Sequence, residues 1–77
     1  MNEKGISLKE LYVLGKSRMK QQGIENPELE TSLLISKALG IKTLDIYIHP
    51  EKKVDPDKVA ELMELIDRRA IRKEPIA

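Results

Sequence analysis

The feature that most constrains this 77-residue chain is the spacing of its prolines and glycines, which mark where helices start and end. Asn-Pro-Glu at 26–28 and Asp-Pro-Asp at 55–57 both predict helix starts, with a capping side chain, proline at the first helical position and an acid facing the positive end of the helix dipole. Gly23 and Gly40 stand where left-handed residues would end helices. These marks divide the chain into segments of helical length.

The first segment, from Ser7 to Gly23, carries strong local helix signals. Ser7 with Glu10 three residues later is the pattern of a capping box, and Ile6 and Leu11 are spaced for a hydrophobic staple. A stripe at 3–4 spacing follows, made of Leu8, Leu11, Tyr12, Gly15 and Met19. Gly15 weakens a helix, so its place on the stripe predicts a close helix crossing. Ile24, just past Gly23, is placed to fold back onto the last turn.

The second segment predicts the most buried helix, ending at Gly40. Its apolar face is broader than a single stripe, and we expect Leu33 to lie in the core. The apolar residues are Leu29, Leu33, Leu34, Ile35, Ala38 and Leu39.

The segment 41–50 fits either a short helix capped by Thr43 or a strand, because residues 44–48 alternate in polarity. We favour the helix, since no other segment offers a strand partner and a lone strand leaves its backbone groups unsatisfied. We expect His49 and Pro50 to stop this helix and residues 51–54 to form a charged loop.

The last helix begins at residue 55 and ends in a basic run. Its expected inner face consists of Val59, Leu62, Met63, Ile66 and Ala70, and Glu64 and Arg68 form a favourable i,i+4 pair. The core lacks Phe and Trp and is built from aliphatic residues. The fold class predicted is all-α: a small helical bundle of three main helices plus one short helix.

Length and charge limit the function classes. Seventy-seven residues form one domain, with residues 1–6 as a flexible lead-in, 7–73 as the helical domain and 74–77 as the start of a connector. The net charge of +1 with interspersed signs argues against direct nucleic-acid binding. No cysteine is present, and no apolar run approaches the roughly 18 residues of a membrane span. We expect a cytoplasmic monomer.

No catalytic, cofactor-binding or metal-binding constellation is evident in the sequence. His49 is the only histidine, and a turn or C-capping role suits it better than a metal site. The glycines are too dispersed for a phosphate loop. Glu28 and Glu30 point to different sides of a helix, so we expect them to serve the helix dipole and solubility.

One charge asymmetry stands out at the end of the chain, in Arg68, Arg69, Arg72 and Lys73. Cations in a last helical turn complement the negative end of the helix dipole. The alternative is that these four residues contact an acidic partner protein or a neighbouring domain. They are therefore the candidate protein-contact residues.

Several motifs together resemble a known family. They are GIENPELE at 23–30, the leucines at 33–34, ALG at 38–40, LDIY at 44–47, the arginines at 68–69 and EPIA at 74–77. This pattern resembles the N-terminal domain of the release-factor glutamine methyltransferase (HemK/PrmC) family, over about residues 8–77. In that family Glu74, Pro75, Ile76 and Ala77 would form the exit into the interdomain connector. Lys73 departs from the glycine that relatives often have there.

The resemblance implies a fold and a function. Members join a small helical bundle to a methyltransferase domain that uses S-adenosylmethionine. They methylate the glutamine side-chain amide in the Gly-Gly-Gln motif of class I peptide chain release factors. The cofactor and catalytic residues belong to the second domain, so none is assigned here, and the expected partners are the release factor and that second domain. The alternative is a stand-alone helical module that binds proteins or nucleic acid.

Overall fold

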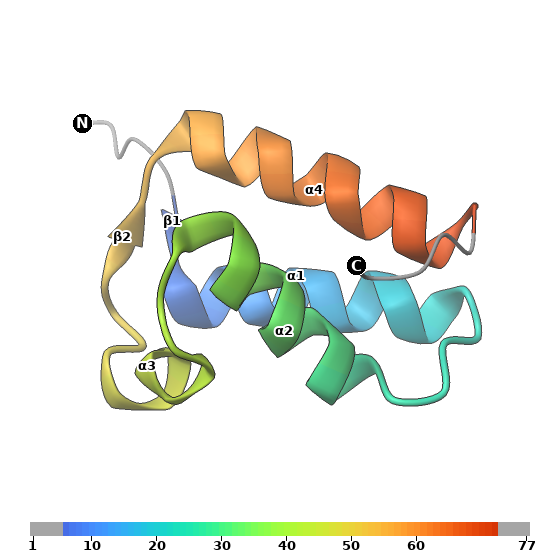
Figure 1. The fold of residues 1–77 in the computed structure, drawn as a ribbon, viewed down its shortest axis with the longest axis horizontal. Coiled ribbons are helices and arrows are strands. Elements are labelled where there is room, and N and C mark those ends of the chain that lie inside the picture. The colour runs from blue at the N-terminus through green and yellow to red at the C-terminus, as the bar shows by residue number, and fades with distance from the viewer. Residues whose placement is uncertain (1–5, 73–77) are drawn as a thin grey trace.

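The computed structural model describes residues 6–72 as a bundle of helices with one very short sheet (Figure 1). The elements in chain order are β1 (Ile6–Ser7), α1 (Leu8–Gln21), α2 (Pro27–Leu39), α3 (Thr43–Ile48), β2 (Lys53–Val54) and α4 (Pro56–Ala70). The helices α1 and α4 run in the same direction from the strand end of the molecule, and α2 runs back the other way, packed against both (Figure 1). The predicted bundle of three main helices and one short helix is confirmed. The expected lead-in at 1–5 and the connector lie outside the described residues.

The predicted caps of α1 are present at both of its ends. The Ser7 hydroxyl accepts from the Glu10 N–H at 3.1 Å, and the Glu10 carboxylate accepts from the Ser7 N–H at 2.9 Å. At the other end Gly23 has φ +80°, and the Ile24 N–H donates to the Met19 carbonyl at 3.1 Å. That bond turns the chain back and buries Ile24 against the last turn, as the sequence predicts.

The caps predicted for the other helices are partly wrong. Neither Asn26 nor Asp55 makes a side-chain cap bond, so the prolines at the first helical position mark these starts without that help. The ψ of Asn26 is 71°, whereas Ser7 has the extended 161° that brings a cap side chain over the first turn. In α3, the N-cap residue is Lys42 and not Thr43, and its N–H donates to the Asp45 carboxylate at 3.2 Å.

The ambiguous segment is the helix α3, as favoured, and it stops at His49. The His49 N–H donates to the Asp45 carbonyl at 2.8 Å, so the backbone of His49 caps the helix.

The expectation of a plain loop at 51–54 is wrong. Ile6 pairs with Val54 and Ser7 with Lys53 in an antiparallel register, so Ile6 belongs to a strand and not to a lead-in. The pairing continues into the helix, because the Leu8 N–H donates to the Lys52 carbonyl at 2.8 Å. The first N–H groups of any helix lack partners within it, and here a segment more than 40 residues away supplies them. The segment just before α4 is thereby held beside the start of α1.

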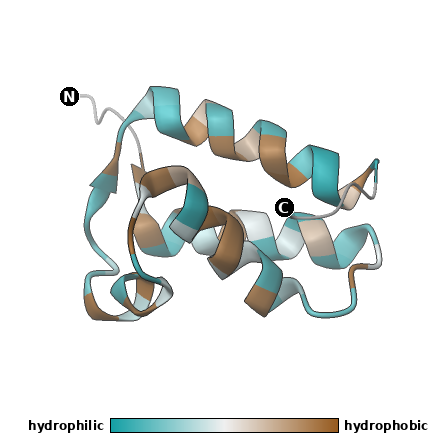
Figure 2. Cartoon of the chain, viewed as in Figure 1, coloured by the Kyte–Doolittle hydropathy of each residue, from teal (hydrophilic) through white to brown (hydrophobic). Residues whose placement is uncertain are grey.

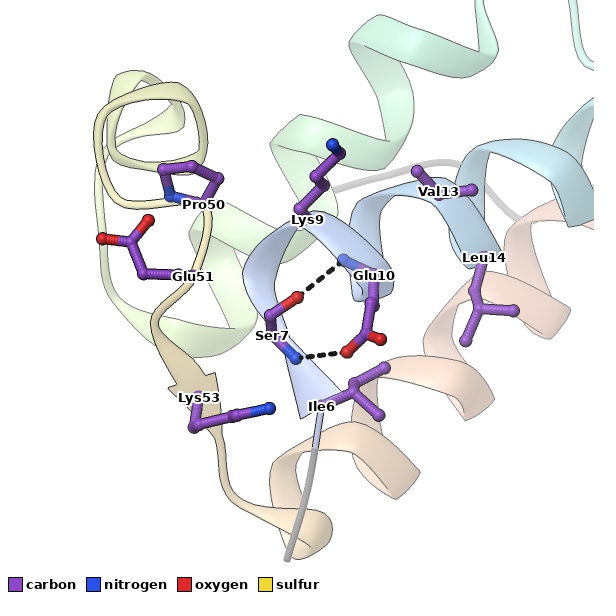
Figure 3. Close-up of a pocket in the computed structure, with 9 residues that line it drawn as sticks. All are labelled: Ile6, Ser7, Lys9, Glu10, Val13, Leu14, Pro50, Glu51 and Lys53. Atoms are coloured by element: carbon purple, nitrogen blue, oxygen red, sulfur yellow. Dashed lines mark hydrogen bonds between the residues drawn. The ribbon is translucent and has the colours of Figure 1, made fainter. Parts of the chain in front are cut away.

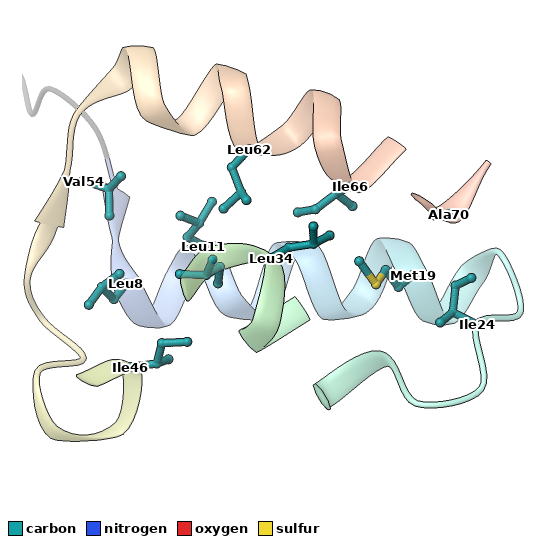
Figure 4. Close-up of a cluster of buried hydrophobic side chains, with 11 residues drawn as sticks. Leu8, Leu11, Met19, Ile24, Leu34, Ile46, Val54, Leu62, Ile66 and Ala70 are labelled. Carbon is teal, nitrogen blue, oxygen red and sulfur yellow. The ribbon is translucent and has the colours of Figure 1, made fainter. Parts of the chain in front are cut away.

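The core lies between α1, α2 and α4 (Figure 4). It contains Leu8, Leu11, Met19, Ile24, Leu34, Ile35, Ile46, Val54, Leu62, Ile66 and Ala70. The inner face predicted for α4 is confirmed: three of its residues are buried, and Val59 and Met63 are partly buried. Hydrophobic residues are spread widely over α2, while α4 is largely hydrophilic away from the core (Figure 2).

The broad apolar face predicted for α2 does not lie entirely in the core. Leu33 is 40% exposed and Leu29 is 57% exposed. They lie on the side of α2 opposite Thr31, which is fully buried against α1. The sequence prediction of Leu33 as a core residue is therefore wrong, since a helix can present only part of its circumference to its neighbours.

Gly15 is the predicted close crossing. A Cβ atom on this residue would lie 2.8 Å from Ile66 Cδ1 and 2.8 Å from Thr31 Cγ2. Because only a glycine leaves space for these two side chains, α1 packs tightly against α2 and α4 at the same point.

Candidate protein-contact surfaces

The basic end of α4 is engaged with the rest of the bundle. Arg69 forms a two-point ion pair with Glu30 in the first turn of α2, with an Nη2–Oε2 distance of 2.9 Å. Both side chains are mostly covered, and this carboxylate raises the pKa of Arg69. Glu30 therefore holds two helices together, a role that the sequence analysis missed because the partners are 39 residues apart.

The other charges at this end are also paired. Arg18 of α1 reaches Asp67 of α4 at 2.8 Å, and Arg68 lies 3.6 Å from Glu64, the predicted i,i+4 pair. Both pairs are exposed, so each contributes little to stability. They do change the charge character of the surface, since an acid stands beside each of these arginines.

A shallow hollow of about 250 Å³ marks the same end, lined by Glu64, Asp67, Arg68, Ile71 and Arg72. Arg72 lies beyond the last residue of α4, and Lys73 is outside the described residues. The helix dipole interpretation fits Arg68 and Arg69, which lie in the last turn. The hollow is mixed in sign and is not a uniformly basic patch. Contact of these arginines with a partner stays a prediction.

A second surface, formed by α3, has the opposite character. Leu44, Tyr47 and Ile48 are 60%, 62% and 54% exposed, while Ile46 is the buried residue of this six-residue helix. Positions i, i+3 and i+4 lie on one side of a helix, so the three exposed residues form one apolar face. We call these three side chains the α3 face.

Two aromatic rings connect the α3 face to α1. Tyr47 meets Tyr12 edge to face, with ring centroids 6.2 Å apart, and the Lys16 ammonium lies 5.4 Å from the centre of the Tyr12 ring. Burial, together with a hydrogen bond to Tyr47, raises the pKa of Tyr12 to about 12. The Tyr12 hydroxyl therefore stays neutral over the physiological range, while the Lys16 ammonium lies beside its ring.

A groove of about 850 Å³ lies near the start of α1 (Figure 3). Ile6, Val13, Leu14 and Pro50 contribute its apolar lining, and Lys9 and Lys53 lie at its border. Glu10 also lines it, but its carboxylate accepts from the Ser7 N–H in the capping box, and this bond lowers the pKa of Glu10. Pro50, which lines the groove, follows Ile48 of the α3 face by two positions in the sequence.

The comparison with known families decides what kind of domain this is. The model of the PrmC N-terminal domain matches residues 10–77, nearly the whole chain. The chain belongs to the PrmC N-terminal domain family. The resemblance drawn from the sequence motifs is thus confirmed.

Relatives of this PrmC N-terminal domain have one name in common. Three proteins called release factor glutamine methyltransferase match it. The Geobacter sulfurreducens protein is 38% identical over 73% of this chain, and the Caulobacter vibrioides protein is 28% identical over 94% of it. The Deinococcus radiodurans protein is 27% identical over 87% of the chain. The matched parts are 19–25% of the relatives' lengths, so the chain spans about a quarter or less of each. No solved structure matches it closely.

The described part of this PrmC N-terminal domain shows neither a side-chain cluster for a metal ion nor a helix for spanning a membrane. Residues 6–72 contain no group of three or more His, Asp or Glu side chains placed to hold a metal ion. In the same residues, no helix is both long and apolar enough to cross a membrane. Of the three surfaces above, the sequence singled out only the arginines, so the α3 face and the groove were missed. The signal for the α3 face was the spacing of Leu44, Tyr47 and Ile48, which places them on one side of a helix.

Proposed function

We propose that this domain is the front part of an S-adenosylmethionine-dependent methyltransferase that modifies a glutamine side chain of a release factor. The observation that carries the proposal is the family match over residues 10–77, together with three relatives that have that name. In this proposal the cofactor and the reacting groups are held by a second domain that follows residues 74–77. The place of action is the cytoplasm, where release factors serve translation.

The role that we propose for the domain itself is to help hold the release factor. A protein substrate offers binding energy far from its reacting atoms, and an enzyme can use that energy to position the target glutamine. The exposed apolar and charged side chains at both ends of this bundle are suited to such contacts. The glutamine that we expect to be modified is that of the Gly-Gly-Gln motif.

The test compares the full-length protein with a version that lacks residues 1–73. Two substrates are used: the folded release factor and a short peptide that carries the target glutamine. Removing the domain is expected to weaken release-factor binding and to lower kcat/KM for the folded release factor, but to leave peptide methylation nearly unchanged. Equal binding and equal methylation of the release factor by both proteins would refute the proposed role.

A further inference from the structure

The last turn of α4 is held against two other helices. Helix ends ordinarily fray, because their last carbonyl groups lack partners within the helix. In this turn, however, Asp67 is bound to Arg18 of α1 at 2.8 Å. Arg69 is bound to Glu30 of α2 at two points, and Ala70, the last residue of α4, has no exposed surface. Two ion pairs and one core residue therefore attach a single turn to the rest of the bundle.

These attachments restrain the direction in which α4 ends. A helix end that is held at one point can pivot about it, whereas attachments to α1, to α2 and to the core restrain both its tilt and its rotation. At the start of the same helix, Pro56 and Asp57 are exposed, and Lys58 pairs with Glu61 inside α4. The two ion pairs that tie α4 to other helices thus both lie at the end from which the chain continues (Figure 1).

The Glu30–Arg69 pair is better suited to fixing a direction than to adding stability. The Arg69 and Glu30 side chains are only 23% and 19% exposed, and the removal of two charges from water offsets much of their attraction. Apolar side chains of similar size often stabilise such a contact as well or better. A guanidinium group and a carboxylate that meet at two points, in contrast, fit together in one relative orientation.

We infer that the Glu30–Arg69 pair is a clamp that sets the orientation of the bundle relative to the domain that follows it. The Arg18–Asp67 pair is a second support of the same turn. This inference rests on the proposed function and deepens it, because it names the residues that position the substrate.

The clamp has a purpose only if both domains handle the same release factor. A release factor held by the bundle presents its glutamine productively to the second domain when the two domains keep a defined arrangement. With a loose junction, the bundle would still bind the release factor but would raise only its local concentration. Glu30 and Arg69 are thus positioning residues, which act through the junction and not on the reacting atoms.

The test uses the full-length enzyme with Glu30→Gln, which keeps the shape of the side chain and removes its charge. The kcat for the folded release factor is expected to fall about tenfold, since a misplacement of about 1 Å can lower a rate by a factor of about 100. The dissociation constant for the release factor is expected to change less than about threefold, because binding by the bundle does not need a fixed junction. Methylation of the short glutamine peptide, which the second domain positions alone, is expected to stay unchanged. Small-angle X-ray scattering of the free enzyme gives a readout besides activity: a looser junction broadens the distribution of interatomic distances.

The matched control is Glu61→Gln. It makes the same chemical change at a carboxylate whose ion pair, with Lys58, stays within α4, and it is expected to leave kcat and the scattering unchanged. A second variant exchanges the charges of the clamp, by Glu30→Arg combined with Arg69→Glu. It is expected to recover most of the lost kcat, although the helix dipoles favour the original charge at both positions. Such a recovery distinguishes the ion pair from a general loss of packing.

The outcomes separate the inference from the proposed function. If removal of residues 1–73 weakens release-factor binding but Glu30→Gln keeps the wild-type kcat, the inference is overturned, while the proposed function stands. If Glu30→Gln weakens binding as much as removal of the domain does, the pair maintains the fold of the bundle and not its orientation, so the inference also fails. An unchanged distance distribution, a charge exchange that recovers no activity, or an equal loss of kcat in Glu61→Gln would likewise overturn it. If removal of the domain changes neither binding nor methylation of the release factor, both proposals are wrong.

Discussion

Replacement of Gly15 by alanine sets two opposing effects against each other. In an exposed helix interior, Gly→Ala stabilises by about 1 kcal/mol because alanine restricts the unfolded chain and favours the helix. At this crossing the new methyl group would lie 2.8 Å from Ile66 Cδ1 and 2.8 Å from Thr31 Cγ2. Both distances are far shorter than an ordinary carbon–carbon contact of about 3.5–4.0 Å, so at least two helices must move apart or two side chains must turn.

Neither Ile66 nor Thr31 can move away easily from a methyl group at position 15. Ile66 and Thr31 have no exposed surface, and Thr31 is β-branched with its hydroxyl donating to the Met19 sulfur at 3.6 Å. Overpacking of a core costs about 1–3 kcal/mol, and contact with two helices at once favours the upper part of that range. After the helix gain is subtracted, Gly15→Ala is expected to destabilise the domain by about 1–2 kcal/mol.

Urea unfolding of the 77-residue chain measures this difference through the midpoint and the slope. Ser17→Ala, on the exposed side of α1, is the control for helix propensity and is expected to leave stability equal or slightly higher. Thr31→Ser removes Cγ2 but keeps a hydroxyl, so it should cost less in the Gly15→Ala background than in the wild type. An alanine variant that is as stable as the wild type, or more stable, would refute the packing argument.

Burial and the shifted pKa values of Tyr12 and Glu10 lead to three further predictions. Leu62→Ala is expected to cost about 2–5 kcal/mol, because the side chain is fully buried, whereas Leu33→Ala should cost less than about 1 kcal/mol; equal urea midpoints would contradict this. In the Tyr47→Phe variant the remaining tyrosine is Tyr12. The absorbance of its phenolate should titrate above pH 10 but below pH 12, because the burial of Tyr12 persists while its hydrogen bond to Tyr47 is lost. A midpoint at pH 10 would show that burial does not raise the pKa of Tyr12. Folding lowers the pKa of Glu10 from 4.5, so the capping bond of Glu10 stabilises the fold above pH 4.5 and is lost as the pH falls through the lowered pKa. The difference in urea midpoint between the wild type and Glu10→Ala should therefore shrink in acid. A difference that stays constant with pH would contradict the charge argument.

The parts of the fold that the sequence predicts correctly are those decided within a few residues. The capping box of Ser7 and Glu10 and the left-handed turns at Gly23 and Gly40 depend on local geometry alone. The crossing at Gly15 was also predictable, because a glycine on a buried stripe has a cost that close packing explains.

The parts that could not be predicted depend on segments far apart in the chain. The pairing of Ile6 with Val54 requires that the segment after α3 lie beside the start of α1. No local sequence pattern predicts that arrangement. The Glu30–Arg69 pair depends on how α2 and α4 are placed. Leu33 was misassigned for the same reason: with apolar residues on most sides of α2, only the packed neighbours decide which side is covered.

The α3 helix carries exposed apolar residues that its own anchors do not use. Six residues are too few to form a stable helix alone, so α3 depends on its anchors, which are buried Ile46, the Asp45 bond to the Lys42 N–H and the His49 backbone cap. None of these anchors uses Leu44 or Ile48. Polar side chains at those two positions would keep the same anchors and would expose less apolar surface to water. The fold of the domain alone therefore does not account for Leu44 and Ile48.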